Sequence, residues 1–186
     1  TRFQSDGSIA PALAKSWSIS SDNLTYTFNL NKKVIFHDGI PMTSKDIKFS
    51  LDRARSQDST NAQKALFKDI KSIEIIDSST VVINLKQPNG NFIANMAWGD
   101  AVIVSEQSIS KAETAPVGTG PFKFSKWVKG DRVELVRNNR YWGQQISLDK
   151  AVFKFISDPT AAFAAMMAGD IDAFPIFPAP ENLSQF

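Results

Sequence analysis

The chain has 186 residues, of which 42% are hydrophobic and 22% charged, the balance of a folded globular protein rather than a disordered segment. Basic residues exceed acidic ones by only two charges, which is weak support for nucleic-acid binding, and we expect no nucleic-acid partner. Cysteine is absent and no apolar run approaches the roughly 20 residues of a membrane-spanning helix, so disulfide bonds, thiolate catalysis, cysteine-ligated zinc and a transmembrane span are excluded.

Two short runs near the start of the chain alternate large apolar with small polar residues, the pattern of a half-buried strand. Trp17 and Ile19 alternate with serines, and residues 25–30 alternate Tyr, Phe and Leu with Thr and Asn. The Ser-Asp-Asn sequence at 21–23 can form the turn between the two runs. The pattern predicts an antiparallel hairpin.

A helix is predicted to begin at Thr43, whose hydroxyl can cap free N–H groups while Asp46 lies favourably in the first turn. Ile47 and Leu51 fall on one face of this helix, and charged residues fall on another. We expect an amphipathic helix that ends near Ser56.

The rest of the chain predicts further hairpins and short helices. In chain order, we expect a short helix over 64–69, a hairpin over 70–85, a short helix around 92–98, a strand over 101–104, a hairpin about a turn at 129–131, a strand over 151–156, and a helix over 160–168 that Asp158 and Pro159 begin and Gly169 ends. Two prolines and two glycines crowd residues 115–121, which predicts a boundary there.

One histidine occurs in the chain, and its position beside a carboxylate invites comparison with general-base catalysis. Adjacent strand residues point to opposite faces, and no serine lies in a Gly-x-Ser-x-Gly setting. We therefore interpret His37 as a turn residue whose ring lies on a sheet edge, with a hydrolase that uses His37 and Asp38 kept as the alternative. The carboxylates lack calcium-loop spacing, and residues 118–121 lack the rest of a phosphate-binding loop, so we expect neither a metal nor a cofactor.

Most large apolar residues fall within predicted regular elements, where core packing is their simplest role. We expect such packing for Trp17, Trp127, Trp142, Phe163, Met166 and Met167. Trp98 differs because it lies between a predicted helix and a predicted strand, where its ring can reach into a cleft and Gly99 lets a ligand approach the backbone. Core packing remains the alternative role of Trp98.

Six motifs occur in a characteristic order along the chain. They are Ile9–Trp17 with its Pro-x-Leu-Ala-x-x-Trp pattern, Leu24–Leu30, Phe36–Gly39 followed by Pro41, Thr43, Asp46 and Ser50, Gly118–Phe122, Arg137–Trp142 with its Asn-x-x-Tyr-Trp pattern, and Ala168–Asp172. Together they resemble the family 5 extracellular solute-binding proteins, the dipeptide, oligopeptide and nickel receptors of ABC importers. The resemblance covers almost the whole chain.

The resemblance implies a mixed α/β (α+β) fold like that of the type II periplasmic binding proteins. Residues 1–115 would form a small additional domain of antiparallel hairpins and helices, and residues 116–186 would begin the first ligand-binding lobe. The rest of that lobe and the second lobe would lie outside this chain. We accordingly expect an N-terminal fragment, in keeping with Thr1 at its start and with a C-terminal stretch that has no clear closing element.

By resemblance, the function expected is that of the substrate-binding component of an ABC transporter, which captures small peptides in the periplasm and delivers them to permease subunits in the membrane. It would not be an enzyme. Alternative cargoes are a nickel chelate, haem, glutathione or an oligosaccharide, and a further alternative is an interaction module in residues 1–115. Trp98, Gly99 and Asp100 are the residues expected to face the cleft. The truncated edge should expose apolar surface and cause self-association as a homo-oligomer.

Overall fold

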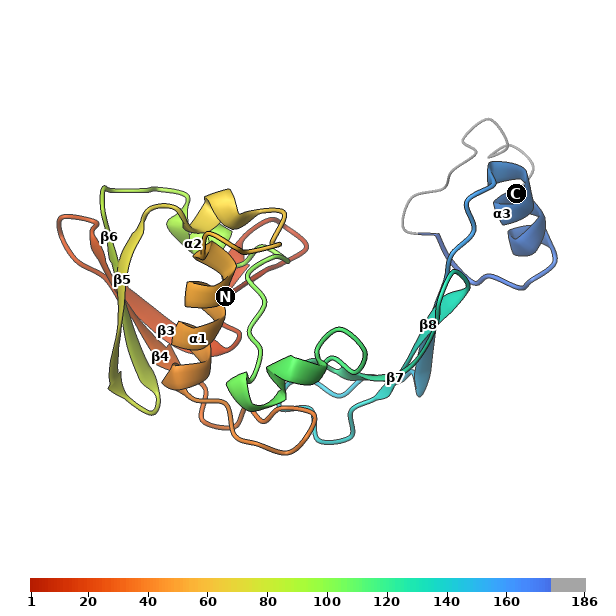
Figure 1. The fold of residues 1–186 in the computed structure, drawn as a ribbon, viewed down its shortest axis with the longest axis horizontal. Coiled ribbons are helices and arrows are strands. Elements are labelled where there is room, and N and C mark those ends of the chain that lie inside the picture. The colour runs from red at the N-terminus through yellow and green to blue at the C-terminus, as the bar shows by residue number, and fades with distance from the viewer. Residues whose placement is uncertain (175–186) are drawn as a thin grey trace.

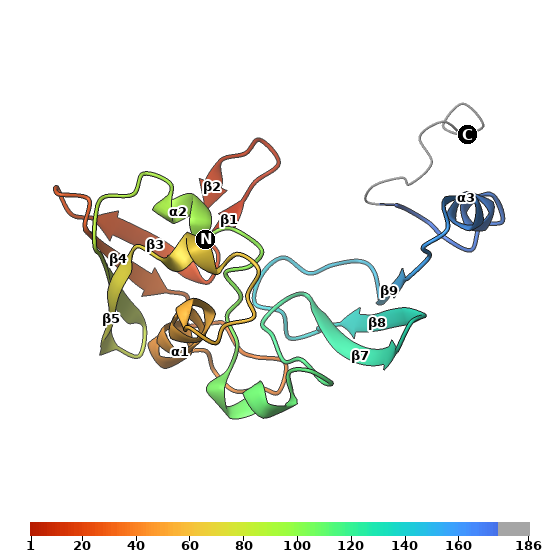
Figure 2. The ribbon, with the colours of Figure 1, turned by 45° about the horizontal axis from the view of Figure 1, so that its top comes forward.

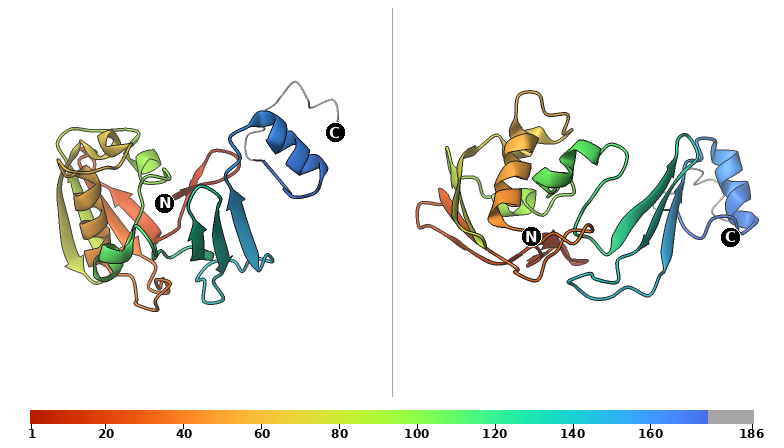
Figure 3. Two further views of the ribbon diagram at one scale, coloured as in Figure 1. Left: turned by 45° about the vertical axis from the view of Figure 1, so that its right-hand side comes forward. Right: turned by 60° about the horizontal axis from the view of Figure 1, so that its bottom comes forward.

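The computed structural model describes residues 1–174. Its elements fall into two bodies, which lie side by side in Figures 1 and 3. The N-terminal body runs from β1 to η2, and the C-terminal body runs from β7 to α3. The element bounds in chain order are β1 (Arg2–Phe3), β2 (Ile9–Ala10), β3 (Ala14–Ile19), β4 (Thr25–Leu30), α1 (Ser44–Arg55), η1 (Lys64–Phe67), β5 (Ile70–Asp77), β6 (Thr80–Leu85), α2 (Phe92–Asn95), η2 (Glu106–Lys111), β7 (Phe122–Val128), β8 (Arg132–Arg137), β9 (Lys150–Lys154) and α3 (Pro159–Met167).

A four-stranded antiparallel sheet in the order β3-β4-β6-β5 forms the frame of the N-terminal body. The predicted hairpins over residues 17–30 and 70–85 are confirmed as β3–β4 and β5–β6. Asn23 makes the first turn with a φ of 58°, a left-handed conformation that Asn tolerates better than most residues. The short strands β1 and β2 pair separately as a two-stranded ribbon, seen in Figure 2.

The predicted amphipathic helix is confirmed as α1, which lies across one face of this sheet (Figure 1). Asp46 caps its first turn, because one of its carboxylate oxygens accepts a hydrogen bond from the Thr43 N–H at 2.8 Å. Ile47 and Leu51 are buried in one core cluster with aromatic and aliphatic residues of β4 and β6. This contact closes the hydrophobic core of the N-terminal body.

The strand predicted over residues 101–104 is wrong, because this segment has no ladder partner among residues 1–174. Its backbone is satisfied in another way: the Val104 N–H donates to the Ser50 hydroxyl oxygen of α1 at 2.9 Å. A buried side chain thus replaces the neighbouring strand as the hydrogen-bond partner. The short helix predicted from residue 92 is confirmed as α2, which ends at Asn95.

The C-terminal body consists of the antiparallel sheet β7-β8-β9 and of α3. The predicted hairpin turns at Gly130, whose φ of 77° favours glycine. Asp158 caps α3 by accepting the Ala161 N–H at 2.7 Å, and the helix is followed by Gly169, also at a φ of 77°. The expectation that the C-terminal stretch lacks a closing element falls mostly on residues 175–186, outside the described residues.

Core packing is confirmed for some of the expected residues and wrong for others. Trp17 and Trp142 pack against the core of the N-terminal body. Trp127 on β7 and Met167 on α3 are 45% and 56% exposed, respectively. The prediction fails for these two because the C-terminal body, unlike the N-terminal one, has too few elements to cover its apolar faces within residues 1–174.

Candidate functional site

Trp98, Gly99 and Asp100 follow α2 in a turn that the Ala101 N–H closes by donating to the Trp98 carbonyl at 3.0 Å. The Trp98 side chain is 52% exposed, so core packing does not account for it. Its ring lies edge-to-face with the ring of Phe3 on β1, with centroids 6.1 Å apart and planes at 85°. Phe3 is itself 42% exposed. The two rings form an open apolar surface, which we call the aromatic pair.

The two residues after Trp98 add backbone access and a charge to this surface. A Cβ at Gly99 would meet no atom within 4 Å, so the backbone there is open to approach. Asp100 is half-buried, and its carbonyl is held by the Asn61 side-chain amide at 2.9 Å. This anchoring fixes the turn while the side chains of Trp98 and Asp100 remain available to a ligand. The arrangement suits an apolar group and a cationic group.

Sequence reasoning missed Phe3. No local pattern marks it, because its partner Trp98 is distant in the chain and only the folding of the β1–β2 ribbon brings the two rings together. An isolated aromatic beside a two-residue strand carries no periodicity from which exposure can be predicted.

Backbone groups engage both His37 and Asp38. The His37 Nδ1 accepts the Gly118 N–H at 3.2 Å, and the Nε2 lies 3.1 Å from the Gly120 carbonyl oxygen. The Asp38 carboxylate accepts the Ile40 N–H at 3.1 Å and thus closes its own turn. Both imidazole nitrogens are therefore occupied by backbone groups. The sequence pattern placed the His37 ring on a sheet edge. In the structure the ring instead packs against the segment 118–120.

Burial lowers the pKa of His37 below its usual value. The hydrogen bond to Gly120 opposes this shift, the positive charge of Lys123 adds to it, and the negative charge of Asp38 opposes it. An open hollow of about 350 Å³ lies beside the ring, lined partly by Lys123, Phe124 and Ser125 of β7. The hollow marks the joint between the two bodies.

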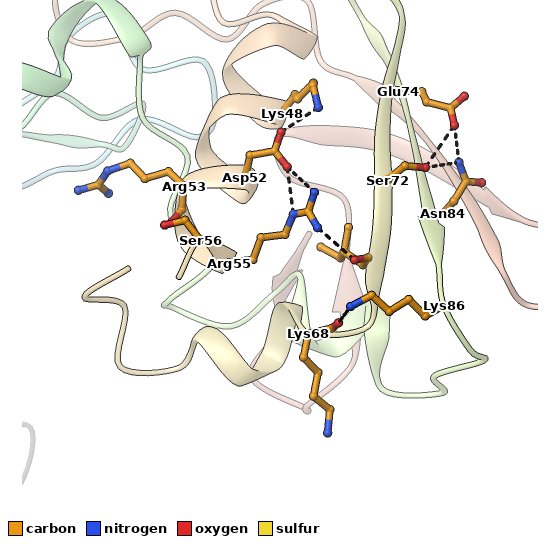
Figure 4. Close-up of polar contacts among 11 residues, drawn as sticks. Lys48, Asp52, Arg53, Arg55, Ser56, Lys68, Ser72, Glu74, Asn84 and Lys86 are labelled. Carbon is orange, nitrogen blue, oxygen red and sulfur yellow. Dashed lines mark hydrogen bonds and ion pairs between the residues drawn. The ribbon is translucent and has the colours of Figure 1, made fainter. Parts of the chain in front are cut away.

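Other polar clusters and cavities of the described residues have structural roles. At the C-terminal end of α1, Asp52 pairs with Lys48 at 2.8 Å and with Arg55 at 2.7 Å, and Arg55 also donates to the Ile70 carbonyl (Figure 4). This network ties α1 to β5. An apolar cavity of about 80 Å³ under α1 is lined almost entirely by core residues. Residues 1–174 contain no cluster of His, Asp and Glu that could hold a metal ion, and no helix among them is long and apolar enough to cross a membrane.

Comparison with known proteins gives consistent matches. Residues 8–185 match the family described as "Bacterial extracellular solute-binding proteins, family 5 Middle". A putative ABC transporter peptide-binding protein of Brucella ovis is 41% identical over 168 residues, which cover 86% of this chain and 32% of that protein. A glutathione-binding protein of Pectobacterium atrosepticum is 35% identical over 180 residues, covering 94% of this chain and 35% of that protein.

Among solved structures, the ABC transporter-associated periplasmic binding protein DppA of Helicobacter pylori, in complex with the peptide STSA, is similar with a TM-score of 0.88 and 32% identity. The match covers 100% of this chain and 42% of that chain. Together with the antiparallel sheets, it confirms the predicted mixed α/β fold of the type II periplasmic binding proteins. The chain spans about a third of the length of the curated relatives that it matches.

Proposed function

Because the chain belongs to the bacterial extracellular solute-binding proteins of family 5, we propose that it is the N-terminal part of a receptor that captures small peptides for an ABC importer. The observation that carries this proposal is the similarity to peptide-binding relatives over most of the chain. The receptor works in the periplasm and delivers its cargo to permease subunits in the membrane. Residues 1–115 form its small additional domain, and residues 116–186 begin its first lobe.

The receptor performs no catalysis in this proposal. The relatives are substrate-binding proteins, and His37, the one histidine of the chain, has both ring nitrogens engaged by backbone groups. A hydrolase based on His37 and Asp38 would require a free Nε2 or Nδ1 to take a proton from a nucleophile. We therefore expect no hydrolytic activity that the His37→Ala substitution would abolish.

The aromatic pair and the residues that follow Trp98 form one wall of the peptide site. Apolar peptide side chains pack against the exposed rings of Phe3 and Trp98, the open backbone at Gly99 permits close approach, and the Asp100 carboxylate attracts a cationic group. The opposite wall comes from polypeptide outside this chain. A two-lobed receptor gains affinity when both lobes contact the ligand, so residues 1–186 alone should bind weakly.

Calorimetry of the complete receptor against a set of peptides tests this function. We expect peptides to bind and the other candidate cargoes, a nickel chelate, haem, glutathione and an oligosaccharide, to bind more weakly. Glutathione is the second candidate because a glutathione-binding protein is among the relatives. Strong binding of one of these cargoes with no binding of peptides would disprove the peptide assignment.

The Trp98→Ala variant of the complete receptor tests the site. Loss of an exposed aromatic wall should weaken peptide binding about tenfold or more, or roughly 1–3 kcal/mol. Trp127→Ala is a matched control, because Trp127 is also exposed but lies on the C-terminal body, at β7. Equal effects of the two substitutions, or none from Trp98→Ala, would remove Trp98 from the site.

A further inference from the structure

The two bodies are joined by a set of contacts on the segment 118–120, which we call the clasped segment. His37, in the loop between β4 and α1, contacts it through both its backbone and its ring. The His37 N–H donates to the Gly118 carbonyl at 2.8 Å, and the Gly118 N–H donates to the His37 Nδ1 at 3.2 Å. The His37 Nε2 lies 3.1 Å from the Gly120 carbonyl oxygen. One residue of the N-terminal body therefore engages two residues of the segment that leads into β7.

These partners determine which ring nitrogen carries the proton. The Nδ1 accepts from an N–H group and so must be unprotonated, whereas the Nε2 faces a carbonyl oxygen and so must donate. The geometry therefore requires the neutral imidazole protonated at Nε2. A second proton on Nδ1 would place two donors against each other and remove the bond to Gly118.

The clasped segment is also held by groups of the C-terminal body that do not titrate. The Asn138 side-chain amide donates to the Gly120 carbonyl at 3.0 Å, and the Trp142 Nε1 donates to the Thr119 carbonyl at 2.9 Å. These bonds keep the segment attached to the C-terminal body whatever the protonation of His37. The contacts that depend on the protonation of the His37 ring are therefore those between the segment and the N-terminal body.

The charged groups that face the ring come from three elements. They are Asp38 in the same loop, Lys123 on β7, and Arg140, whose Nη2 lies 3.5 Å from the His37 carbonyl oxygen. The positive charge of Lys123 opposes a positive imidazole, and the Asp38 carboxylate, which also accepts the Ile40 N–H, favours it.

We propose that His37 is a protonation-sensitive clasp: its neutral ring holds residues 118–120 against the N-terminal body, and its protonation in mild acid loosens the joint between the two bodies. The proposal goes beyond solute capture and does not depend on the cargo. Partial contact persists after release, because Val117 and Trp142 also pack against the core of the N-terminal body. The change is therefore a loosening of the joint and not a separation.

The direction of the pH effect follows from linkage. Burial lowers the pKa of His37 from its ordinary value of 6.5, so the detached state binds the extra proton more readily than the clasped state. The stability that the clasp contributes is fully present above pH 6.5 and is lost as the pH falls from there through the lowered pKa of the clasped ring.

Nuclear magnetic resonance of the 186-residue chain tests the proposal directly, since its single histidine gives an unambiguous ring signal. At about pH 7.5 the ring nitrogen shifts should report the neutral form protonated at Nε2. The hydrogen-exchange protection factor of the Gly118 amide should fall about tenfold or more between pH 7.5 and pH 5, whereas that of Phe28 in β4 should stay constant. The opposite tautomer at pH 7.5, or unchanged protection of Gly118, would overturn the proposal.

Two variants separate protonation from simple loss of packing. The His37→Asn variant keeps an acceptor near the Nδ1 position but cannot titrate, so its Gly118 protection should be the same at both pH values. The His37→Phe variant keeps a ring without an acceptor, so its protection should be low at both. A pH-dependent loss of protection in His37→Asn as large as in the wild type would contradict the role of the imidazole. If His37→Asn does not fold, the tautomer and the wild-type exchange data still decide.

Discussion

Glu134 on β8 shows how neighbouring charges set the titration of a single residue. Its carboxylate oxygens lie 2.7 Å from the Lys150 Nζ and 2.7 Å from the Arg132 Nε. These contacts, that of Lys150 first, lower the pKa of Glu134 from 4.5 to about 2. Because Lys150 lies on β9, the carboxylate links two strands of the C-terminal sheet.

The stability of the Glu134→Gln variant should depend less on pH in the acid range than that of the wild type. A carboxyl group with a lowered pKa contributes stability that is present above its unfolded pKa, near 4.5, and is lost as the pH falls toward 2. We therefore expect the melting temperature of the wild type to fall more steeply than that of Glu134→Gln over this range, with calorimetry as the measurement. Lys150→Met, which removes one of the two cations, should give an intermediate slope. Equal slopes for the wild type and Glu134→Gln would show that the contacts do not matter in solution.

Single residues were also where sequence patterns failed. Trp127 and Met167 both lie in contexts that a pattern cannot separate from a buried one, and both are about half exposed. Their exposure depends on which elements cover them, and that is decided by tertiary contacts. The hydrogen bonds between His37 and residues 118–120 were likewise not predictable, because the sequence of a turn does not indicate a backbone partner that is distant in the chain.

At the scale of elements, Ser50 links α1 to the irregular segment that precedes η2. It is 3% exposed, and its hydroxyl accepts the Val104 N–H at 2.9 Å. The Ser50→Ala variant would leave this N–H without its partner, which should lower the free energy of unfolding by about 1–3 kcal/mol. Urea denaturation of the 186-residue chain measures the change.

Ser56→Ala is the control for this experiment. The Ser56 hydroxyl likewise contacts a backbone group, since it donates to the Arg53 carbonyl, but at an exposed helix end. Its loss should change the free energy of unfolding by no more than about 0.5 kcal/mol. A Ser50→Ala variant as stable as Ser56→Ala would mean that water or a shift of residues 101–104 replaces the hydroxyl.

Elements with clear periodicity were predictable from the sequence, and those without it were not. The alternation in β4 and β6 and the apolar face of α1 predicted strands and a helix correctly, because burial on one face imposes those periods. The Ala-Val-Ile-Val run at 101–104 is equally typical of a strand, yet no strand in the described part of the chain pairs with it. Only the tertiary position of Ser50 explains its conformation.

At the scale of the whole molecule, β9 leaves apolar side chains exposed at the edge of the C-terminal sheet. Val152 and Phe153 are 43% and 58% exposed, and because they are adjacent in a strand they point to opposite faces. Such surface promotes association. We therefore propose that the 186-residue chain forms homo-oligomers through this edge.

The Phe153→Asp variant tests this association. The mass of the wild type measured by light scattering should rise with protein concentration, and the variant should show a smaller rise. Ile76→Asp is a matched control, since Ile76 is 60% exposed on β5 of the N-terminal body. A wild type that stays monomeric at high concentration, or an equal response of both variants, would argue against the β9 edge.

The fold class was predictable only at this largest scale, from motifs spread over almost the whole chain. No single motif specified it, but their order matched a known architecture, and the structural likeness to DppA confirms it. The candidate site was predictable in part: the sequence indicated Trp98, Gly99 and Asp100, while Phe3 became visible only through the fold. The division at residue 115 and the role of the site stay predictions.

The strand order β3-β4-β6-β5 constrains the order of events in folding. The β3–β4 and β5–β6 hairpins are local and can form early, whereas the β4–β6 pairing, such as Asn29 with Thr80, must close a loop that contains all of α1. The chain loses conformational entropy on closing that loop before the β4–β6 contacts stabilise it. We therefore expect the β4–β6 pairing to be the slow step of folding. Substitutions in the β4–β6 seam should therefore retard refolding, and substitutions in the outer strand β3 should chiefly hasten unfolding.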